Sequence, residues 1–127
     1  WAPDKVALLF FLFFYPLALS HLGLNDLIDI KNDVAREMNT ITVLYGIKGT
    51  VKWILLFNLI HITMAMIFVL ILPKSTFYGF LISFVLLLTT TYTLLKDPTP
   101  IKGLKILPLY HLSMIIYSIS IIFGTLI

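Results

Sequence analysis

The sequence has 127 residues, of which 60% are hydrophobic and 12% are charged, and its formal net charge is +3. Globular proteins carry about 25% charged residues, so this composition excludes an ordinary water-soluble domain. The positive charge is too small and too dispersed to indicate nucleic-acid binding. The absence of cysteine excludes disulfides, thiol catalysis and thiolate metal sites.

Four apolar segments follow one another along the chain, and each is long enough to cross a bilayer, for which about 20 helical residues suffice. They cover residues 6–24, 51–72, 77–95 and 106–127. Lipid offers no hydrogen-bond partner to the backbone, so each segment is predicted to be a helix, and Pro16 is predicted to kink the first one. The sequence therefore predicts an all-α integral membrane bundle of four transmembrane helices, in a single membrane domain over residues 1–127.

The connections after the first and third apolar segments hold most of the charged residues. Seven of the nine cationic side chains lie there: Lys31, Arg36, Lys48, Lys52, Lys96, Lys102 and Lys105. Five of the six acidic residues lie there too: Asp26, Asp29, Asp33, Glu37 and Asp97. Cytoplasmic loops are enriched in Lys and Arg, so both connections and the acidic residues are predicted to face the cytoplasm.

Residues 25–50 form the longest polar stretch, and it contains no proline. A structureless loop of this length is uncommon in a compact domain. The first helix is therefore predicted to continue through residues 28–38, followed by a short helix or lid at residues 40–45, with breaks at Gly46 and Gly49. We predict that residues 25–50 are a cytoplasmic segment that binds a metal ion and a diphosphate.

The prediction of a metal site depends on a row of three aspartates. On a continuous helix, Asp26, Asp29 and Asp33 lie within an arc of about 60° on one face. Carboxylates at this spacing repel one another, and a bound cation relieves the repulsion. Oxygen ligands without histidine or cysteine favour Mg²⁺ over Zn²⁺. We therefore predict that the three aspartates, assisted by Asn25, bind Mg²⁺; the alternative is that they are solvated loop residues.

Cationic side chains lie on the same predicted side of the membrane. Mg²⁺ typically joins one or two carboxylates to phosphate oxygens. Arg36, Lys48, Lys52 and Lys102 are predicted to bind the phosphate charge that remains. A diphosphate site beside apolar helices indicates a substrate with an anionic head and a hydrocarbon tail.

Residues 25–46 resemble the second aspartate-rich motif of the UbiA-type intramembrane prenyltransferases. Asp29 and Asp33 match the paired acids of the family's D-x-x-x-D pattern, and residues 40–46 match the tail that follows it. Family members have nine transmembrane helices and two such motifs. The resemblance implies that this chain corresponds to helices 6–9, the C-terminal part of a larger bundle. It also implies that the same or another polypeptide supplies the N-terminal half, and that this part alone is inactive.

The resemblance further implies an activity, prenyl transfer. Mg²⁺ held by the catalytic pair Asp29 and Asp33 would bind the diphosphate of an isoprenyl donor, with Tyr45 as a further diphosphate-binding residue. The allylic C–O bond would ionise, and the carbocation would alkylate a lipophilic acceptor within the bilayer. The acceptor stays open between an aromatic ring, a quinone precursor, a chlorin and a glycerol ether. Glu37 and Thr42 stand where many family members have glycine and proline, which leaves the subfamily open.

Two other functions are considered. The first alternative is a non-catalytic multi-span subunit, whose acids are solvated or pair with a partner. The second alternative is a CDP-alcohol phosphotransferase. The stretch 33–36 resembles part of the latter family's motif, but the aspartates that should follow it are absent. Outside the acidic segment, Asn58 and His61 are predicted to form hydrogen bonds between helices. His21 and His111 are predicted to have structural and interfacial roles.

Overall fold

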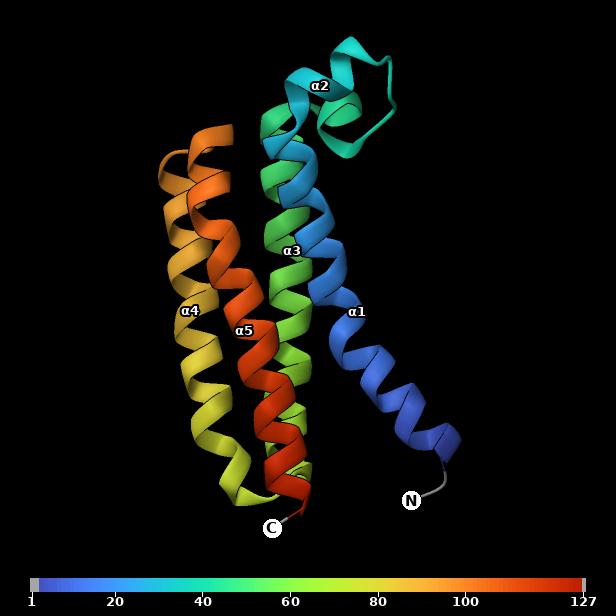
Figure 1. Cartoon of the computed structure of the whole chain (residues 1–127), viewed down its shortest axis with the longest axis vertical. Coiled ribbons are helices and arrows are strands. Elements are labelled where there is room, and N and C mark those ends of the chain that lie inside the picture. The colour runs from blue at the N-terminus through green and yellow to red at the C-terminus, as the bar shows by residue number, and fades with distance from the viewer. Residues whose placement is uncertain (1–2, 127) are drawn as a thin grey trace.

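The computed structural model describes residues 3–126, and every regular element in that range is helical. Figure 1 shows four long helices that form an elongated bundle, with a short helix at the upper end of the view. The elements are α1 (Pro3–Ile28), α2 (Ile30–Ala35), α3 (Ile41–Ile71), the 3₁₀ turn η1 (Lys74–Thr76), α4 (Phe77–Lys96) and α5 (Pro100–Leu126). The predicted all-α class is confirmed.

Four helices are long and apolar enough to cross a membrane, as a multi-pass membrane protein requires. Two of them begin well before the predicted apolar segments: α3 begins at Ile41 rather than near residue 51, and α5 begins at Pro100 rather than near residue 106. Proline suits the first helical position, because a backbone N–H at that position has no acceptor within the helix and its loss costs nothing. Thr99 adds a cap, since its Oγ1 accepts a hydrogen bond from the Lys102 backbone N–H at 3.3 Å. The connection between α4 and α5 is therefore only residues 97–99.

Helix α1 bends, and its N-terminal half leaves the other helices (Figure 1). Pro16 lies inside this helix and is buried. A proline within a helix removes one backbone hydrogen bond and bends the axis, which accounts for the direction of α1. Next to the bend, His61 of α3 lies with its Nδ1 at 2.9 Å from the Phe13 carbonyl oxygen. The carbonyl only accepts, so Nδ1 carries the proton, and a neighbouring helix stabilises the distorted backbone of α1.

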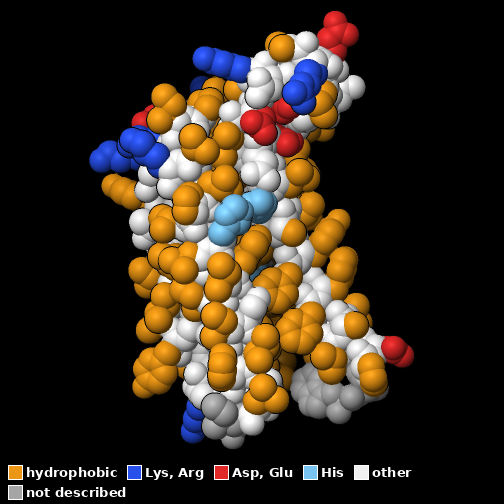
Figure 2. Space-filling view, in the orientation of Figure 1, with side chains coloured by type: hydrophobic (Ala, Val, Ile, Leu, Met, Phe, Trp, Pro, Cys, Tyr) orange, Lys and Arg blue, Asp and Glu red, His pale blue; other side chains and the backbone are white. Residues whose placement is uncertain are grey.

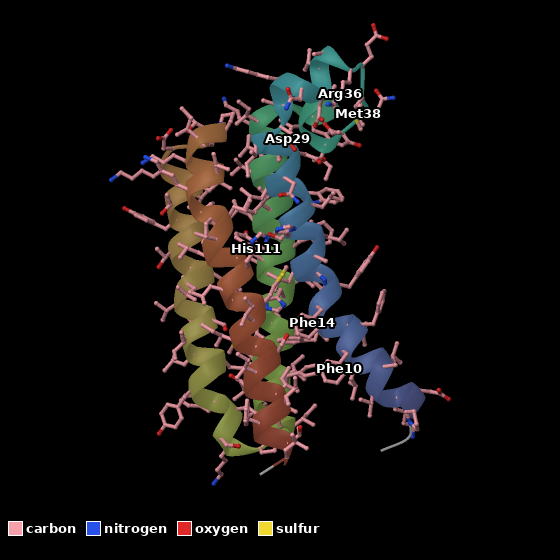
Figure 3. All side chains as sticks on the ribbon, in the orientation of Figure 1. Phe10, Phe14, Asp29, Arg36, Met38 and His111 are labelled. Atoms are coloured by element: carbon pink, nitrogen blue, oxygen red, sulfur yellow. The ribbon has the colours of Figure 1, made fainter. Side chains whose placement is uncertain are left out.

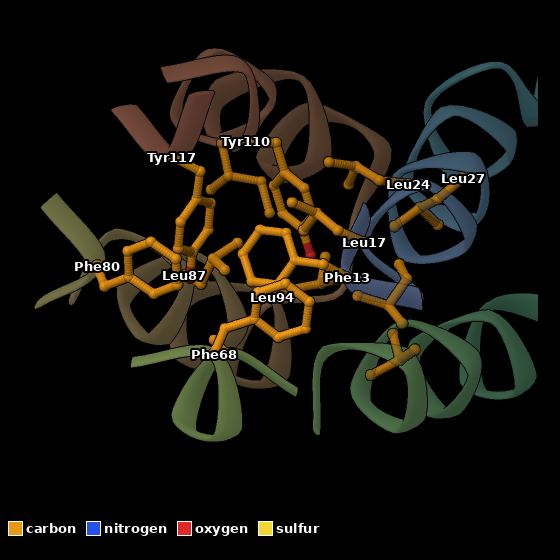
Figure 4. Packing of buried hydrophobic residues seen from close by; sticks show 14 of the residues in the cluster. Phe13, Leu17, Leu24, Leu27, Phe68, Phe80, Leu87, Leu94, Tyr110 and Tyr117 are labelled. Atoms are coloured by element: carbon orange, nitrogen blue, oxygen red, sulfur yellow. The ribbon is translucent and has the colours of Figure 1, made fainter. Parts of the chain in front are cut away.

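The buried core runs between the four long helices. Figure 4 shows aromatic and aliphatic side chains from all of them in mutual contact, among them Phe13, Leu17, Phe68, Leu87, Tyr110 and Tyr117. Phe13 is central to the aromatic part: its ring centroid lies 5.0 Å from those of Phe68 and Tyr117. The outer surface is also mostly apolar (Figure 2), as expected for a bundle surrounded by lipid.

A closed ring of hydrogen bonds joins three helices inside this core. Ser20 Oγ of α1 donates to Asn58 Oδ1 of α3 at 2.6 Å, and Asn58 Nδ2 donates to the Tyr110 hydroxyl of α5 at 2.8 Å. Tyr110 and Ser20 lie 3.0 Å apart, and because the Ser20 proton is already used, Tyr110 is the donor. Asn58 Nδ2 also donates to Thr91 Oγ1 of α4 at 2.9 Å. The predicted hydrogen bonds of Asn58 and His61 between helices are confirmed.

Candidate functional site

The aspartate row spans the junction of α1 and α2. Asp26 lies in the last turn of α1, Asp29 lies at the break between the helices with φ −92° and ψ 10°, and Asp33 lies in α2. Backbone hydrogen bonds of 3.0 Å from Asp29 N to Asn25 O and from Asp33 N to Asp29 O keep the helical spacing across the break. The chain is therefore nearly a continuous helix here, as predicted, although it ends at Ala35 rather than Met38.

The three carboxylates have different environments. Asp29 is exposed, Asp26 is half-buried, and Asp33 is only 8% exposed. Asp26 Oδ2 accepts a hydrogen bond of 2.8 Å from the backbone N–H of Ile41. Ile41 is the first residue of α3, whose leading N–H groups have no partner within the helix, so Asp26 caps α3. The sequence prediction assigned Asp26 to the metal and missed this role.

The pKa of Asp26 shows that the three carboxylates of the row interact with one another. It lies at the polar end of α1, after the apolar residues 6–24. Partial burial raises the pKa of the Asp26 carboxyl above its ordinary value, because burial disfavours the charged form. The hydrogen bond from Ile41 lowers the pKa, whereas the carboxylates of Asp33 and Asp29 raise it further. The acids are thus close enough to repel one another, as the spacing predicted.

The described residues restrict how a metal could be held. Within residues 3–126, no group of three or more His, Asp and Glu side chains is arranged to form a metal centre by itself. Mg²⁺ typically takes one or two carboxylates and completes its octahedron with phosphate oxygens and water. The oxygen donors of Asp29 and Asp33 fit that requirement. With one oxygen bonded to Ile41, Asp26 has less capacity to serve as a ligand than was predicted.

The predicted diphosphate-binding residues come from three helices at the same end of the bundle. Arg36 follows α2, Tyr45 and Lys48 lie on either side of Gly46, Lys52 is one turn further along α3, and Lys102 is in the first turn of α5. Figure 2 shows cationic and acidic side chains together at this end, and Figure 3 shows Arg36 and Asp29 at the same end of the bundle. All five side chains are at least partly exposed, so they are accessible to an anionic ligand.

Two local features set the positions of these cations. Gly46 has φ 72° and ψ 177°, a conformation that is almost exclusive to glycine. It separates the first turn of α3 from the part that carries Lys48 and Lys52, as predicted. The second predicted break, at Gly49, is wrong, because Gly49 lies within the helix. At the start of α5, a Cβ on Gly103 would lie 3.1 Å from Ile28 Cγ1. The absence of that Cβ allows the turn containing Lys102 to pack against the end of α1.

A histidine pair lies beside the acidic end and was not predicted. His21 of α1 and His111 of α5 face each other with Nε2 atoms 3.0 Å apart. Asn25, predicted to assist the metal, has its Nδ2 at 3.3 Å from His21 Nδ1. The only sequence signal was the four-residue spacing of His21 and Asn25, because the partner His111 lies 90 residues away.

No protein-family model matches this chain, and neither does any curated protein or solved structure. The resemblance to the prenyltransferases therefore rests on the residues of the acidic segment alone.

Proposed function

We propose that this chain takes part in Mg²⁺-dependent transfer of a prenyl group from an isoprenyl diphosphate to a lipophilic acceptor in the membrane. The observation that carries the proposal is a row of carboxylates in helical spacing at one polar end of an apolar bundle. Within that row Asp29 is exposed and Asp33 is 8% exposed, and the hydrogen bond from Ile41 goes to Asp26 instead. Carboxylates at this spacing repel one another, and a bound divalent cation removes the repulsion.

In this proposal each group of residues has a separate task. Asp29 and Asp33 hold Mg²⁺, which when bound would neutralise charge on the leaving diphosphate. Arg36, Lys48 and Lys52 bind the outer phosphate oxygens, since cationic donors form strong hydrogen bonds to them. The remaining predicted diphosphate ligands, Tyr45 and Lys102, close the site from α3 and α5. The hydrocarbon tail of the donor extends toward the apolar part of the bundle, where water is excluded.

The proposal includes a further helical bundle. By resemblance, these four helices would form the C-terminal part of a nine-helix fold, and the first aspartate-rich motif would come from the same or another chain. The site would then lie between the two halves, on the cytoplasmic side that the positive-inside rule assigns to this end. The four helices alone are expected to be inactive.

One observation favours the alternative of a non-catalytic subunit. Asp26 already has a structural partner, because its carboxylate caps α3 through Ile41. If Asp29 and Asp33 had comparable roles in a larger assembly, the acidic row would serve folding rather than chemistry. Binding of a prenyl diphosphate separates the two functions.

The test uses the full-length protein in lipid vesicles and a non-hydrolysable probe, farnesyl thiodiphosphate. Wild-type protein is expected to bind the probe in the presence of Mg²⁺ and to lose that binding with EDTA. Asp29→Asn and Asp33→Asn should each weaken Mg²⁺-dependent binding by at least about tenfold, equivalent to about 1.4 kcal/mol. Asp97→Asn is the matched control, because Asp97 lies at the same end but outside the row. Equal binding by all four proteins would exclude the proposed site.

A further inference from the structure

An apolar cavity opens between α3 and α4 in the part of the bundle far from the acidic row. Its volume is about 450 Å³, within the range of ligand pockets, about 300–1,000 Å³. The lining side chains come from within residues 62–70 of α3 and 77–84 of α4, together with Tyr117 of α5. Of these, Met66, Leu70 and Leu81 are also exposed on the outer surface of the bundle. A lipid-soluble molecule can therefore enter the cavity sideways from the bilayer.

Tyr117 is the polar side chain of this cavity. It is fully buried, at 0% exposure, and its hydroxyl has no hydrogen-bond partner among the described residues 3–126. Its ring packs edge to face against Phe80, with the ring centroids 4.9 Å apart (Figure 4). A buried hydroxyl without a hydrogen bond is costly, and buried polar groups in native proteins usually have a partner. A ligand atom in the cavity that accepts the Tyr117 proton supplies that partner.

The neighbouring side chains do not supply it. His61 meets Tyr117 edge to face, with ring centroids 5.2 Å apart and an angle of 78° between the rings. His61 Nδ1 bonds to the Phe13 carbonyl, and His61 Nε2, like the Tyr117 hydroxyl, has no partner within residues 3–126. A buried water molecule needs two to four polar partners, and no lining side chain in that range other than Tyr117 carries oxygen or nitrogen.

The lining indicates the chemical class of the ligand. Phe77, Phe80 and Phe84 follow one another at intervals of three and four residues, so they share one face of α4. Aromatic side chains pack favourably against flat rings, either offset or edge to face. The described lining residues include no charged side chain, so the ligand is neutral. A carbonyl oxygen can accept the Tyr117 proton and leaves no donor unpaired, whereas a ligand hydroxyl would bring a proton of its own.

The depth of Tyr117 separates this site from the acidic end. At a rise of about 1.5 Å per residue, Tyr117 lies about 14 Å from Leu126 and about 26 Å from Pro100 along α5. The hydrocarbon core of a bilayer is about 30 Å thick, so the hydroxyl lies below the phospholipid head groups. The ring of Phe13 is 5.0 Å from that of Tyr117, and Phe13 is about 20 Å along α1 from Asp26. A small molecule bound here does not reach the acidic row.

We propose that this cavity binds a neutral, lipid-soluble ring ketone, a class that includes the quinones, whose carbonyl oxygen accepts a hydrogen bond from Tyr117. The ligand lies against the phenylalanines of α4 and enters between α3 and α4 from the bilayer. This site is separate from the proposed prenyl-transfer site and does not depend on that function.

Three variants distinguish the hydroxyl, the cavity and the outer surface. Tyr117→Phe removes the hydroxyl and keeps the ring. Leu81→Trp fills the mouth of the cavity, because Leu81 lines it and is 46% exposed. Leu88→Trp is the matched control: Leu88 is 45% exposed and lies two turns further along the same face of α4, outside the cavity lining.

The probe is 4-decylbenzophenone, a neutral ring ketone that inserts into nearby C–H bonds under ultraviolet light. Full-length protein in phosphatidylcholine vesicles is labelled at increasing probe concentrations, and mass spectrometry identifies the labelled residues. Wild-type protein should be labelled saturably at Met66 and neighbouring lining residues. Tyr117→Phe should raise the half-saturating concentration about fivefold, as expected for the loss of one neutral hydrogen bond. Leu81→Trp should abolish saturable labelling, and Leu88→Trp should retain it.

Four results would overturn the inference. Labelling of the wild-type protein that does not saturate and covers the whole outer surface would show only partition into lipid. Equal half-saturation of wild-type protein and Tyr117→Phe would exclude the hydroxyl as a ligand contact, and would be expected if water alone joined Tyr117 to His61. Equal loss of labelling in Leu88→Trp and Leu81→Trp would exclude the cavity. A clear loss of stability in Tyr117→Phe, measured by unfolding in mixed micelles, would show that the hydroxyl has a partner within the protein.

The test is independent of the prenyl-transfer proposal. Asp29→Asn should leave labelling at Met66 unchanged, although it should weaken Mg²⁺-dependent binding of farnesyl thiodiphosphate. Failure of either proposal therefore leaves the other intact, and equal loss of both kinds of binding in Asp29→Asn would contradict the separation of the two sites.

Discussion

Replacing Asn58 by leucine removes the residue on which the buried hydrogen-bond ring depends. Its side chain accepts a hydrogen bond from Ser20 at 2.6 Å and donates to Thr91 at 2.9 Å and to Tyr110 at 2.8 Å. These three bonds connect α3 to each of the other long helices. Leucine has a similar size and no polar atom, so the substitution removes the bonds with little change in packing.

The expected loss of stability follows from the number of bonds. Hydrogen bonds between transmembrane helices contribute on average about 0.6 kcal/mol and at most about 1.7 kcal/mol. Asn58→Leu should therefore lower the free energy of unfolding by about 2 kcal/mol, with an upper bound of about 5 kcal/mol. Tyr110→Phe removes the hydroxyl that completes the ring. The double variant should reveal a coupling energy between Asn58 and Tyr110 of about 0.6 to 1.7 kcal/mol.

Reversible unfolding of the protein in mixed micelles, by titration with sodium dodecyl sulfate, measures these free energies. Thr89→Val is the matched control, because Thr89 is exposed and its hydroxyl donates to the Val85 carbonyl of its own helix at 2.8 Å. That change should stay within about 0.5 kcal/mol. Strictly additive effects of Asn58→Leu and Tyr110→Phe, or an equally large effect of Thr89→Val, would refute the reasoning.

Three further predictions concern the acidic end. Gly46→Ala places a side chain on a residue with φ 72° and should lower the stability of the folded state by about 1–3 kcal/mol. The loss should be measurable as faster amide hydrogen exchange in residues 41–45, the turn that precedes Gly46. Asp26→Asn keeps a cap acceptor but has no charge. Because the folded-state pKa of Asp26 is raised, the wild-type protein should gain stability relative to this variant as the pH falls from neutral through that pKa, measured by unfolding at several pH values; a constant difference would contradict the pKa shift. In the full-length protein, Asp29→Ala and Asp33→Ala should each lower prenyl transfer at least about a thousandfold, and Asp97→Ala should not.

The parts of the fold that were predicted from sequence are decided by the lipid environment or by the properties of single residues. A run of about 20 apolar residues without partners for its backbone has few alternatives to a helix in lipid, so the four long helices could be predicted. The break at Gly46 follows from one residue's own conformational freedom. The start of α5 was placed six residues late, because the prediction counted only the apolar run, which begins near residue 106. In the structure Pro100 is instead the first helical residue, after a Thr99 cap.

Contacts between distant residues were not predictable in the same way. Histidines at positions 21 and 111 each have an ordinary structural explanation when considered alone. Only the packing of α5 against α1 brings their Nε2 atoms to 3.0 Å. Asn58 and His61 were predicted to form hydrogen bonds to other helices, but their partners Tyr110 and Phe13 could not be named. The spacing of residues along a helix shows which of them share a face, but it does not show which helix packs against that face.

The hydrogen bond between Ile41 and Asp26 distinguishes Asp26 from the other two candidate metal ligands, which the spacing of the aspartates alone could not do. On an ideal helix the three aspartates are equivalent, and a metal site would use all of them. In the structure, Asp26 directs one oxygen to the first N–H of α3 at 2.8 Å, while Asp29 is exposed and Asp33 is buried beside it. A cation drawn to this row would therefore use Asp29 and Asp33 first. Asp26 would hold the start of α3 against α1, and with it the segment that carries Arg36, and so fix the distance between the acids and the cations.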